Sequence, residues 1–243
     1  MIRSEFRKLS TIRAPWLLLA AGPLLVVAGV TGLVESGGNV HDPSTQRTAL
    51  AHTGLAAIFT LIFGILAVAG EYRHSTITDT YLSSPRRSRV IAAKLSVYGL
   101  TSAAAGLVCS GVALATTAAW WAERGGQLHL SAADTWLTLA GGVAANCAFA
   151  AIGVGVGALI RNPAAAIATA LAWFALIEGI VGQLVGSGLA RWLPFYAGEA
   201  LGRSNLSATA RLLPQWGGGL MLLAYAAAFA AAAGFTTLRR DVT

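Results

Sequence analysis

The sequence contains little charge. Only 11% of its 243 residues are charged, whereas 56% belong to the hydrophobic set. A soluble domain carries about 25% charged residues, and its core could not bury so much apolar surface. The low charge therefore excludes an ordinary soluble domain. It predicts an all-α integral membrane protein, whose structural unit is an apolar helix of about 20 residues.

Lysine is almost absent, and this excludes a nucleotide-binding site of the usual kind. The chain has two lysines, Lys8 and Lys94, and neither follows a glycine-rich loop. A Walker sequence needs that order, because backbone N–H groups of the loop and the lysine ammonium together hold the phosphates. Any work driven by ATP would therefore have to come from a separate subunit.

Enzyme and metal signatures are also missing. The sequence has no nucleophile elbow and no pair of acids inside one apolar stretch. Cys109 and Cys147 lie inside apolar stretches, and we interpret them as packing residues. We therefore expect no catalytic residue, no metal and no cofactor bound by this chain. The histidines are scattered singly, without the spacing of metal ligands: His41, His52, His74 and His129.

What the sequence does contain is a series of long apolar stretches, each sufficient to cross a membrane as a helix. We expect one domain, residues 1–243, with six spans. The fifth stretch is longer than a helix needs to cross a hydrocarbon core of about 30 Å, so it should tilt, break or protrude. The expected spans are about 15–34, 50–69, 95–121, 135–160, 163–189 and 217–238.

Two further segments are neither span nor simple loop. Residues 1–13 place Phe6, Leu9 and Ile12 at three-residue spacing among basic residues, which predicts an amphipathic helix lying on the membrane surface. Residues 190–215 mix aromatic and charged side chains, which predicts a membrane-surface or re-entrant segment between the last two spans. The first span resembles a secretory signal, but its apolar run is too long for one.

The distribution of basic residues predicts orientation. Of the 17 lysines and arginines, 12 lie in the N-terminal segment, the second and fourth connections and the C-terminus. The positive-inside rule therefore places both termini in the cytoplasm. Since these residues lie in short segments between spans, we interpret the net charge of +7 as a topology signal and expect no nucleic-acid partner. Abundant arginine and alanine are typical of a bacterial protein, here one of the plasma membrane.

Three polar residues fall within expected spans and are candidates for a translocation path: Asn146, Glu178 and Gln183. Glu178 is the ionisable residue deepest within a span, and burying it costs a few kcal/mol unless it meets partners or water. If the fifth helix breaks near Gly179, Glu178 would instead lie close to the outer surface. Asn146 and Gln183 are equally compatible with hydrogen bonds between helices.

The most specific pattern lies after the second span. It reads Glu71-Tyr72-Arg73-His74-Ser75-Thr76-Ile77, followed by Pro85-Arg86-Arg87 and then Lys94. Here the chain resembles the permease subunits of ABC-2 type transporters. In that family the second span ends in a glutamate, followed by an arginine, a Thr-Ile-like pair, a Pro-Arg turn and a lysine. The resemblance implies that the segment is a coupling helix docking on an ATPase, with the residues Glu71, Tyr72, Arg73, His74, Thr76, Ile77 and Tyr81.

The same resemblance implies the function and partners of the chain. The N-terminal helix would be the family's connecting helix, and the chain would be the permease of an exporter. It would pair with a second permease copy or paralogue and with two ATPase subunits that carry the ATP and Mg. Membrane lipids would surround it, and the resemblance does not identify the substrate. A membrane-embedded enzyme or a non-transporting sensor or scaffold is the alternative.

Overall fold

The computed structural model describes residues 2–11, 13–74, 76–77, 87–185, 187–204 and 211–237. Every regular element in these ranges is a helix, which confirms the all-α prediction for the described part of the chain. The helices are α1 (Ile2–Thr11), α2 (Ala14–Glu35), α3 (Pro43–Ala51), η1 (His52–Ala56), α4 (Ala57–Arg73), α6 (Arg87–Glu123), α7 (Ala133–Ile160), α8 (Pro163–Ala172), η2 (Trp173–Ile177), α9 (Glu178–Val185), α10 (Ser187–Ala190), α11 (Pro194–Gly202) and α12 (Gln215–Thr237).

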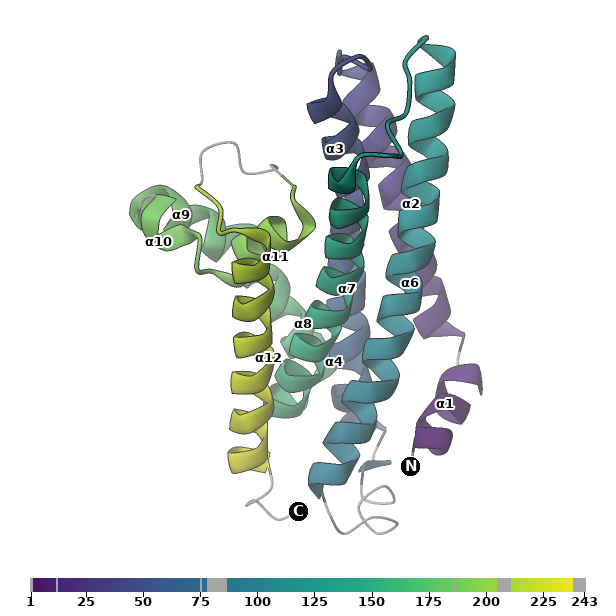
Figure 1. Ribbon diagram of the computed structural model, residues 1–243. Coiled ribbons are helices and arrows are strands. Elements are labelled where there is room, and N and C mark those ends of the chain that lie inside the picture. The colour runs from purple at the N-terminus through teal and green to yellow at the C-terminus, as the bar shows by residue number, and fades with distance from the viewer. Residues whose placement is uncertain are drawn as a thin grey trace.

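Among the described residues, five helical segments are long and apolar enough to cross a membrane, and in Figure 1 they form an upright bundle. They coincide with five of the six apolar stretches of the sequence. The second of them is built from α3, η1 and α4 in succession, so that it is longer than its apolar stretch. The candidate spans are Ala14–Glu35, Pro43–Arg73, Arg89–Glu123, Ala133–Ile160 and Gln215–Phe235.

The remaining apolar stretch, residues 163–189, is irregular. It begins as α8, passes through the π-helical turn η2 and continues as α9. Figure 1 shows α9 and α10 lying across the direction of the long helices. The 10 residues of α8 rise about 15 Å, only half of a hydrocarbon core. The excess length of this stretch is therefore taken up by a break, after which α11 returns beside the start of α12.

Local sequence explains where several helices begin. Asn162 precedes Pro163, and its side-chain oxygen accepts a hydrogen bond from the N–H of Ala165 at 3.1 Å, so that Asn162 caps α8. Asp42 does the same for α3 by accepting from the N–H of Ser44 at 2.8 Å. A cap of this kind satisfies a donor that has no partner inside the helix. These two helices therefore start at fixed residues.

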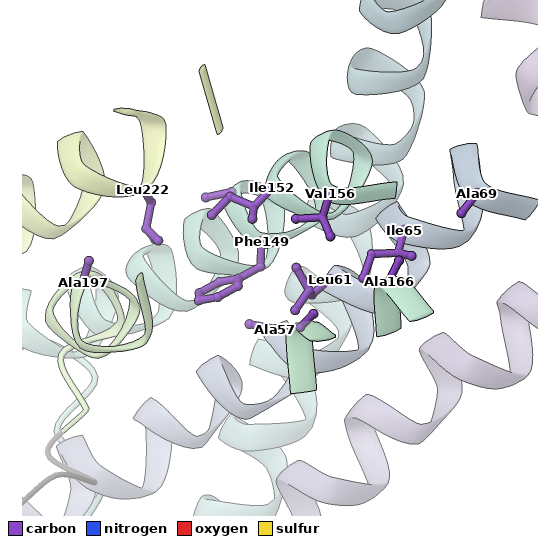
Figure 2. Close-up of a cluster of buried hydrophobic side chains, with 12 residues drawn as sticks. Ala57, Leu61, Ile65, Ala69, Phe149, Ile152, Val156, Ala166, Ala197 and Leu222 are labelled. Atoms are coloured by element: carbon purple, nitrogen blue, oxygen red, sulfur yellow. The ribbon is translucent and has the colours of Figure 1, made fainter. Parts of the chain in front are cut away.

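The centre of the bundle is α7, whose buried side chains meet those of α4. Figure 2 shows Leu61 and Ile65 of α4 facing Phe149, Ile152 and Val156 of α7. The same cluster takes in Ala166 of α8, Ala197 of α11 and Leu222 of α12. One apolar core thus joins the two helices to the irregular segment and the last span.

Glycines let α4 and α7 approach each other closely. A Cβ atom on Gly153 of α7 would collide with the backbone oxygen of Leu61 in α4. A Cβ on Gly64 of α4 would collide in the same way with the oxygen of Ala150 in α7. Small residues at such crossings favour backbone contact in membranes, where the hydrophobic effect contributes little to helix association. The α4–α7 pair is therefore a rigid unit.

One end of the bundle brings together segments that are far apart in sequence. In Figure 1, α1, the end of α4, the start of α6 and the end of α12 all lie at the lower end. The connection between α7 and α8, at Arg161 and Asn162, lies toward the same end. Four segments that the sequence analysis assigned to one side of the membrane therefore share one end of the structure.

We expect Gly153→Ala to destabilise the α4–α7 pair, because the added methyl group meets backbone that cannot move aside. Overpacking of this kind costs about 1–3 kcal/mol. Gly111→Ala in α6 is the matched control, since a Cβ there meets no atom within 4 Å. Thermal unfolding in detergent, followed by tryptophan fluorescence, should show a lower midpoint for Gly153→Ala alone. Equal midpoints for the two variants would show that the contact is not rigid.

Candidate functional site

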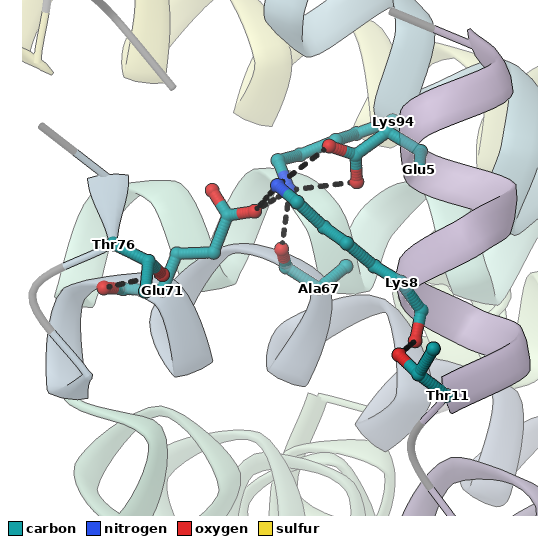
Figure 3. Close-up of polar contacts among 7 residues, drawn as sticks. All are labelled: Glu5, Lys8, Thr11, Ala67, Glu71, Thr76 and Lys94. Carbon is teal, nitrogen blue, oxygen red and sulfur yellow. Dashed lines mark hydrogen bonds and ion pairs between the residues drawn. The ribbon is translucent and has the colours of Figure 1, made fainter. Parts of the chain in front are cut away.

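A cluster of four charged side chains lies where α1, α4 and α6 meet. Glu5 and Lys8 come from α1, three residues apart on one face of that helix. Glu71 lies in the last turn of α4, and Lys94 lies near the start of α6. Figure 3 shows the two ammonium groups next to each other between the two carboxylates. We name these four residues the charge cluster.

Lys94 is the centre of the charge cluster. Its residue is only 1% exposed. The ammonium group donates to Oε2 of Glu5 at 3.0 Å, to Oε1 of Glu71 at 2.8 Å and to the backbone oxygen of Ala67 at 2.8 Å. An ammonium group has three protons to donate. All three thus have an acceptor, so that this buried charge is fully compensated.

Lys8 closes the charge cluster from its outer side. Its ammonium group lies 2.6 Å from Oε1 of Glu71 and 3.1 Å from Oε1 of Glu5. Partial burial lowers the pKa of Lys8, but the hydrogen bonds and charges of Glu71 and Glu5 outweigh burial and raise that pKa above its ordinary value. Two acids and two bases cancel in charge. The protein can therefore bury them, although each ion alone costs several kcal/mol to remove from water.

The charge cluster fixes α1 to the bundle. Glu5 is 3% exposed, and the neighbouring Leu9 is 4% exposed in an apolar cluster with Phe63 and Val97. At the other end of α1, the indole N–H of Trp16 in α2 donates to the backbone oxygen of Leu9 at 2.8 Å. Ile2 and Phe6 stay exposed. One polar contact set and one apolar contact set thus hold a helix of ten residues.

The sequence pattern after the second span includes Glu71 and Lys94 but gives no sign of Glu5 and Lys8 as their partners. The i,i+3 spacing of Glu5 and Lys8 is visible in the sequence, but it is also typical of a solvated helix face. Lys94 next to the start of an apolar stretch was the better signal. A lysine there needs a carboxylate partner, and Glu71 at the end of the preceding span was a candidate, whereas Glu5 lies 89 positions away in the sequence.

The segment that begins at Glu71 presents both buried and exposed residues. Glu71 and Ile77 are buried, whereas Arg73, His74 and Thr76 are exposed. The ring of Tyr72 lies 5.3 Å from the guanidinium carbon of Arg161, in the connection between α7 and α8. Tyr81, Pro85 and Arg86, which the sequence pattern also includes, lie outside the described residues. The described part thus offers polar side chains outward from an anchored base.

Asn146 joins helices at the middle of the bundle. Its amide group donates to the backbone oxygen of Thr53 at 3.1 Å and to that of Gly142 at 2.9 Å. Its side-chain oxygen lies 3.5 Å from the hydroxyl of Thr60, which donates to it. These partners come from η1, α7 and α4. Asn146 therefore has the bonds expected of a residue that holds helices together.

Glu178 caps the start of α11 by accepting a backbone hydrogen bond. Pro194 has no N–H, so the first free donor of that helix is the N–H of Phe195, which donates to Oε2 of Glu178 at 2.8 Å. Oε1 accepts from the indole N–H of Trp173 at 2.9 Å. Glu178 is 1% exposed, whereas Gln183, on the same helix, is exposed. The three candidates for a translocation path thus have three different surroundings.

Within the described ranges no three His, Cys, Asp or Glu side chains gather in a way that could hold a metal ion. The two acids of the charge cluster are neutralised by lysines instead. The arrangement at the end of α4 is therefore suited to a mechanical link between three helices.

Lys94→Met should strongly destabilise the protein. The substitution leaves Glu5 and Glu71 buried without their main partner, and breaking a buried ion pair on one side costs about 3–5 kcal/mol. Lys8→Met is the matched control, because the Lys8 side chain is 39% exposed and its loss should cost less. Combining Lys94→Met with Glu71→Gln should restore part of the loss. Chemical unfolding in detergent gives these free energies, and additive losses in the double variant would contradict the coupling.

Glu178→Ala should loosen the start of α11. Loss of a cap costs about 0.5–2 kcal/mol, so the amide of Phe195 should exchange its hydrogen roughly 2 to 30 times faster. Hydrogen–deuterium exchange followed by mass spectrometry measures this on peptides that contain α11. Gln183→Ala, an exposed change on the same helix, should leave that exchange unchanged. Equal exchange in both variants would show that Glu178 does not hold α11.

Comparison with protein families shows which family the chain belongs to. A family model described as ABC-2 family transporter protein matches residues 28–241, which is most of the sequence. A comparison with individually curated proteins finds no similar sequence. The match agrees with the resemblance of the segment after the second span and with the five helices long enough to cross a membrane. The chain therefore belongs to the ABC-2 transporter family and is a multi-pass membrane component for transport.

Proposed function

We propose that the chain is the permease subunit of an ATP-binding cassette exporter in a bacterial plasma membrane. It forms the translocation path with a second permease, and two separate ATPase subunits supply the energy. Membership of the ABC-2 family supports the transport role. The absence of a Walker sequence from the chain supports the need for separate ATPases.

The observation that carries this proposal is the charge cluster at the base of the segment beginning at Glu71. The ammonium groups of Lys94 and Lys8 lie within 3 Å of Oε1 of Glu71. A displacement of the residues after Glu71 would therefore be transmitted directly to α1 and α6. Arg73, His74 and Thr76 are exposed next to this anchor, as an ATPase docking surface requires. The docking segment is the described part 71–77, and it continues toward Tyr81.

A second part of the bundle extends this surface. A hollow beside the docking segment is lined by Tyr72 and Arg73 on one side and by Arg161, Asn162 and Pro163 on the other. Two arginines make it basic, which suits acidic or carbonyl groups of an ATPase. The connection between α7 and α8 thus becomes part of the proposed contact, which sequence reasoning did not include.

The proposal fixes a topology. Both termini, the docking segment and Arg161 lie in the cytoplasm, in agreement with the positive-inside rule. α1 lies at the membrane surface with Ile2 and Phe6 toward the lipid, since both are exposed while Glu5 is buried. The segment that begins with α8 crosses from the cytoplasmic to the outer side, where α11 lies beside the start of α12. With α12 as the last, this gives six crossings.

In the proposed mechanism, closure of the ATPases on ATP pushes the docking segment toward the membrane. Glu71 lies in the last turn of α4, so the push acts along the axis of that helix. α7 moves with α4 because their backbones are in contact at Gly153 and Gly64. The charge cluster couples α1 and the start of α6 to this movement of α4. Outward transport follows from a change in the spacing of these helices around the path.

Reversing charge on the exposed part of the docking segment should abolish ATPase association. We expect Arg73→Glu with His74→Glu to lower, at least tenfold, the amount of ABC-type ATPase recovered with the tagged chain from its native membrane. Both side chains are exposed, so the variant should insert and fold normally. Quantitative mass spectrometry of the purified complex, with ATP hydrolysis as a second readout, measures the loss.

Arg211→Glu is the matched control for that experiment. Arg211 is exposed and precedes α12, whose start is remote from the docking segment. This variant should recover as much ATPase as the unchanged chain. Undiminished recovery with Arg73→Glu and His74→Glu, or no ATPase with the unchanged chain, would refute the proposed docking.

A further inference from the structure

An apolar groove of about 690 Å³ lies between α2 and α6, with α1 at one end. Its volume falls within the range of ligand sites in proteins, about 300–1,000 Å³. Three helices thus form a site of ligand size that neither the charge cluster nor the docking segment uses. The residues around it are Phe6, Trp16, Leu19, Ala20, Pro23, Leu100, Thr101, Ala104, Ala105 and Val108.

Small side chains leave the space of this groove open. Ala20 on α2 and Ala104 on α6 are exposed, so that neither helix fills the room between them. Large apolar side chains line the same space, and Trp16, Leu100 and Val108 are each at least half exposed. Within the described part of the chain, the groove therefore has the shape of a trough with apolar walls.

The polar atoms that the lining residues carry are already bonded. The hydroxyl of Thr101 donates to the backbone oxygen of Val97 at 2.8 Å, inside α6. The indole N–H of Trp16 donates to the backbone oxygen of Leu9 at 2.8 Å. Since neither group needs a further partner, the groove offers apolar surface to whatever occupies it. Its occupant should therefore be a hydrocarbon chain.

The length of the groove agrees with one leaflet of a membrane. Seven residues separate Trp16 from Pro23 on α2, and eight separate Leu100 from Val108 on α6. At 1.5 Å per residue these distances are about 10 and 12 Å, whereas one half of a hydrocarbon core measures about 15 Å. The groove thus extends from the level of α1 toward the middle of the membrane without crossing it.

Basic residues surround the end of the groove at α1. Arg7 is next to Phe6, and Arg3 precedes Phe6 by one helical turn, so that Arg3 and Phe6 lie on the same side of α1. Arg13 precedes α2, and its backbone oxygen accepts from the N–H of Trp16 at 3.1 Å. The three arginines are exposed, and within the described ranges no ion pair involves them. Three uncompensated positive charges therefore lie at this end.

We propose that the groove binds one anionic phospholipid of the cytoplasmic leaflet. An acyl chain lies in the groove, and the phosphate group lies at Arg3, Arg7 and Arg13. Guanidinium groups suit this role, because they donate paired hydrogen bonds to phosphate. Basic residues close to a membrane surface also attract anionic lipids. The inference rests on the proposed topology, in which α1 lies at the cytoplasmic membrane surface.

A second copy of the chain fits the groove less well than a lipid does. A symmetric dimer uses the same patch of both subunits, so it would bring two sets of Arg3, Arg7 and Arg13 together. Like charges that face each other oppose association. A phospholipid with a net negative charge instead matches both the apolar walls and the basic end.

The test uses the full chain purified in a maltoside detergent, which carries no charge. The probes are dioleoylphosphatidylglycerol and dioleoylphosphatidylcholine, which share their acyl chains and differ in net charge. Native mass spectrometry should show saturable binding of one phosphatidylglycerol molecule, at least tenfold tighter than that of phosphatidylcholine. Equal binding of both lipids, or no saturable binding, would overturn the proposal.

Charge variants locate the head group. Arg3→Gln with Arg7→Gln should weaken phosphatidylglycerol binding at least tenfold, because two guanidinium partners of the phosphate are lost. Both side chains are exposed, so the variant should fold normally. Arg124→Gln with Arg211→Gln is the matched control, since it removes two exposed arginines far from α1. An equal loss in both double variants would mean that net charge alone attracts the lipid, against the proposed site.

A second pair of variants locates the acyl chain. Ala104→Phe fills the groove from an exposed position and should weaken phosphatidylglycerol binding at least tenfold. Ala115→Phe is the matched control, because Ala115 is exposed about three turns further along the same side of α6 and does not line the groove. Unchanged binding in Ala104→Phe would show that the lipid lies elsewhere. A dimer that Ala104→Phe dissociates, with no bound lipid, would assign the groove to a second copy.

The outcome is separable from that of the docking experiment. The lipid titration contains no ATPase, so a failure to bind phosphatidylglycerol overturns the lipid site and leaves ATPase docking untouched. Conversely, Arg73→Glu with His74→Glu should bind the lipid like the unchanged chain, because neither residue lines the groove or belongs to α1.

Discussion

The buried ammonium group of Lys94 is the interaction on which one end of this molecule depends. It brings Glu5 of α1 and Glu71 of α4 to the same point, each within 3.0 Å. A helix of ten residues such as α1 is only marginally stable alone. Its position follows from the ion pairs and from Leu9. Without Lys94 the two carboxylates would keep only the partly exposed Lys8 as a cationic partner, and α1 would be held mainly by Leu9 and Trp16.

The same constraint acts on the whole length of α4. This helix is continuous from Ala57, which lines a cavity of about 160 Å³ beside α2, α7 and α11, to Glu71, which is held by the charge cluster. Fourteen residues separate them, and at 1.5 Å per residue the two points are about 21 Å apart. Because the crossing of α4 with α7 involves backbone at Gly64 and Gly153, it resists sliding between the helices. A displacement at the docking segment therefore reaches the cavity wall as a movement of one body.

Features that depend on residues close together in the sequence could be predicted, whereas those that depend on distant residues could not. The apolar stretches and the cap at Asn162 depend on neighbouring residues, and the sequence contained both. The charge cluster depends on Glu5, Glu71 and Lys94, which lie up to 89 positions apart. Nothing local distinguishes a buried Glu5 from a solvated one, so α1 was interpreted only through its amphipathic pattern. Glu178 was recognised as unusual, but its partner Phe195 lies beyond the break, which hydropathy does not describe.

The walls of the cavity belong to two differently held parts. Ala57, Leu61 and Phe149 lie on the rigid α4–α7 pair, whereas Phe195 and Glu199 lie on the short helix α11. α11 is held at its start by Glu178, and beyond its end Gln215 donates to the oxygen of Leu201 at 3.0 Å. A push along α4 therefore shifts the apolar wall relative to the carboxylate.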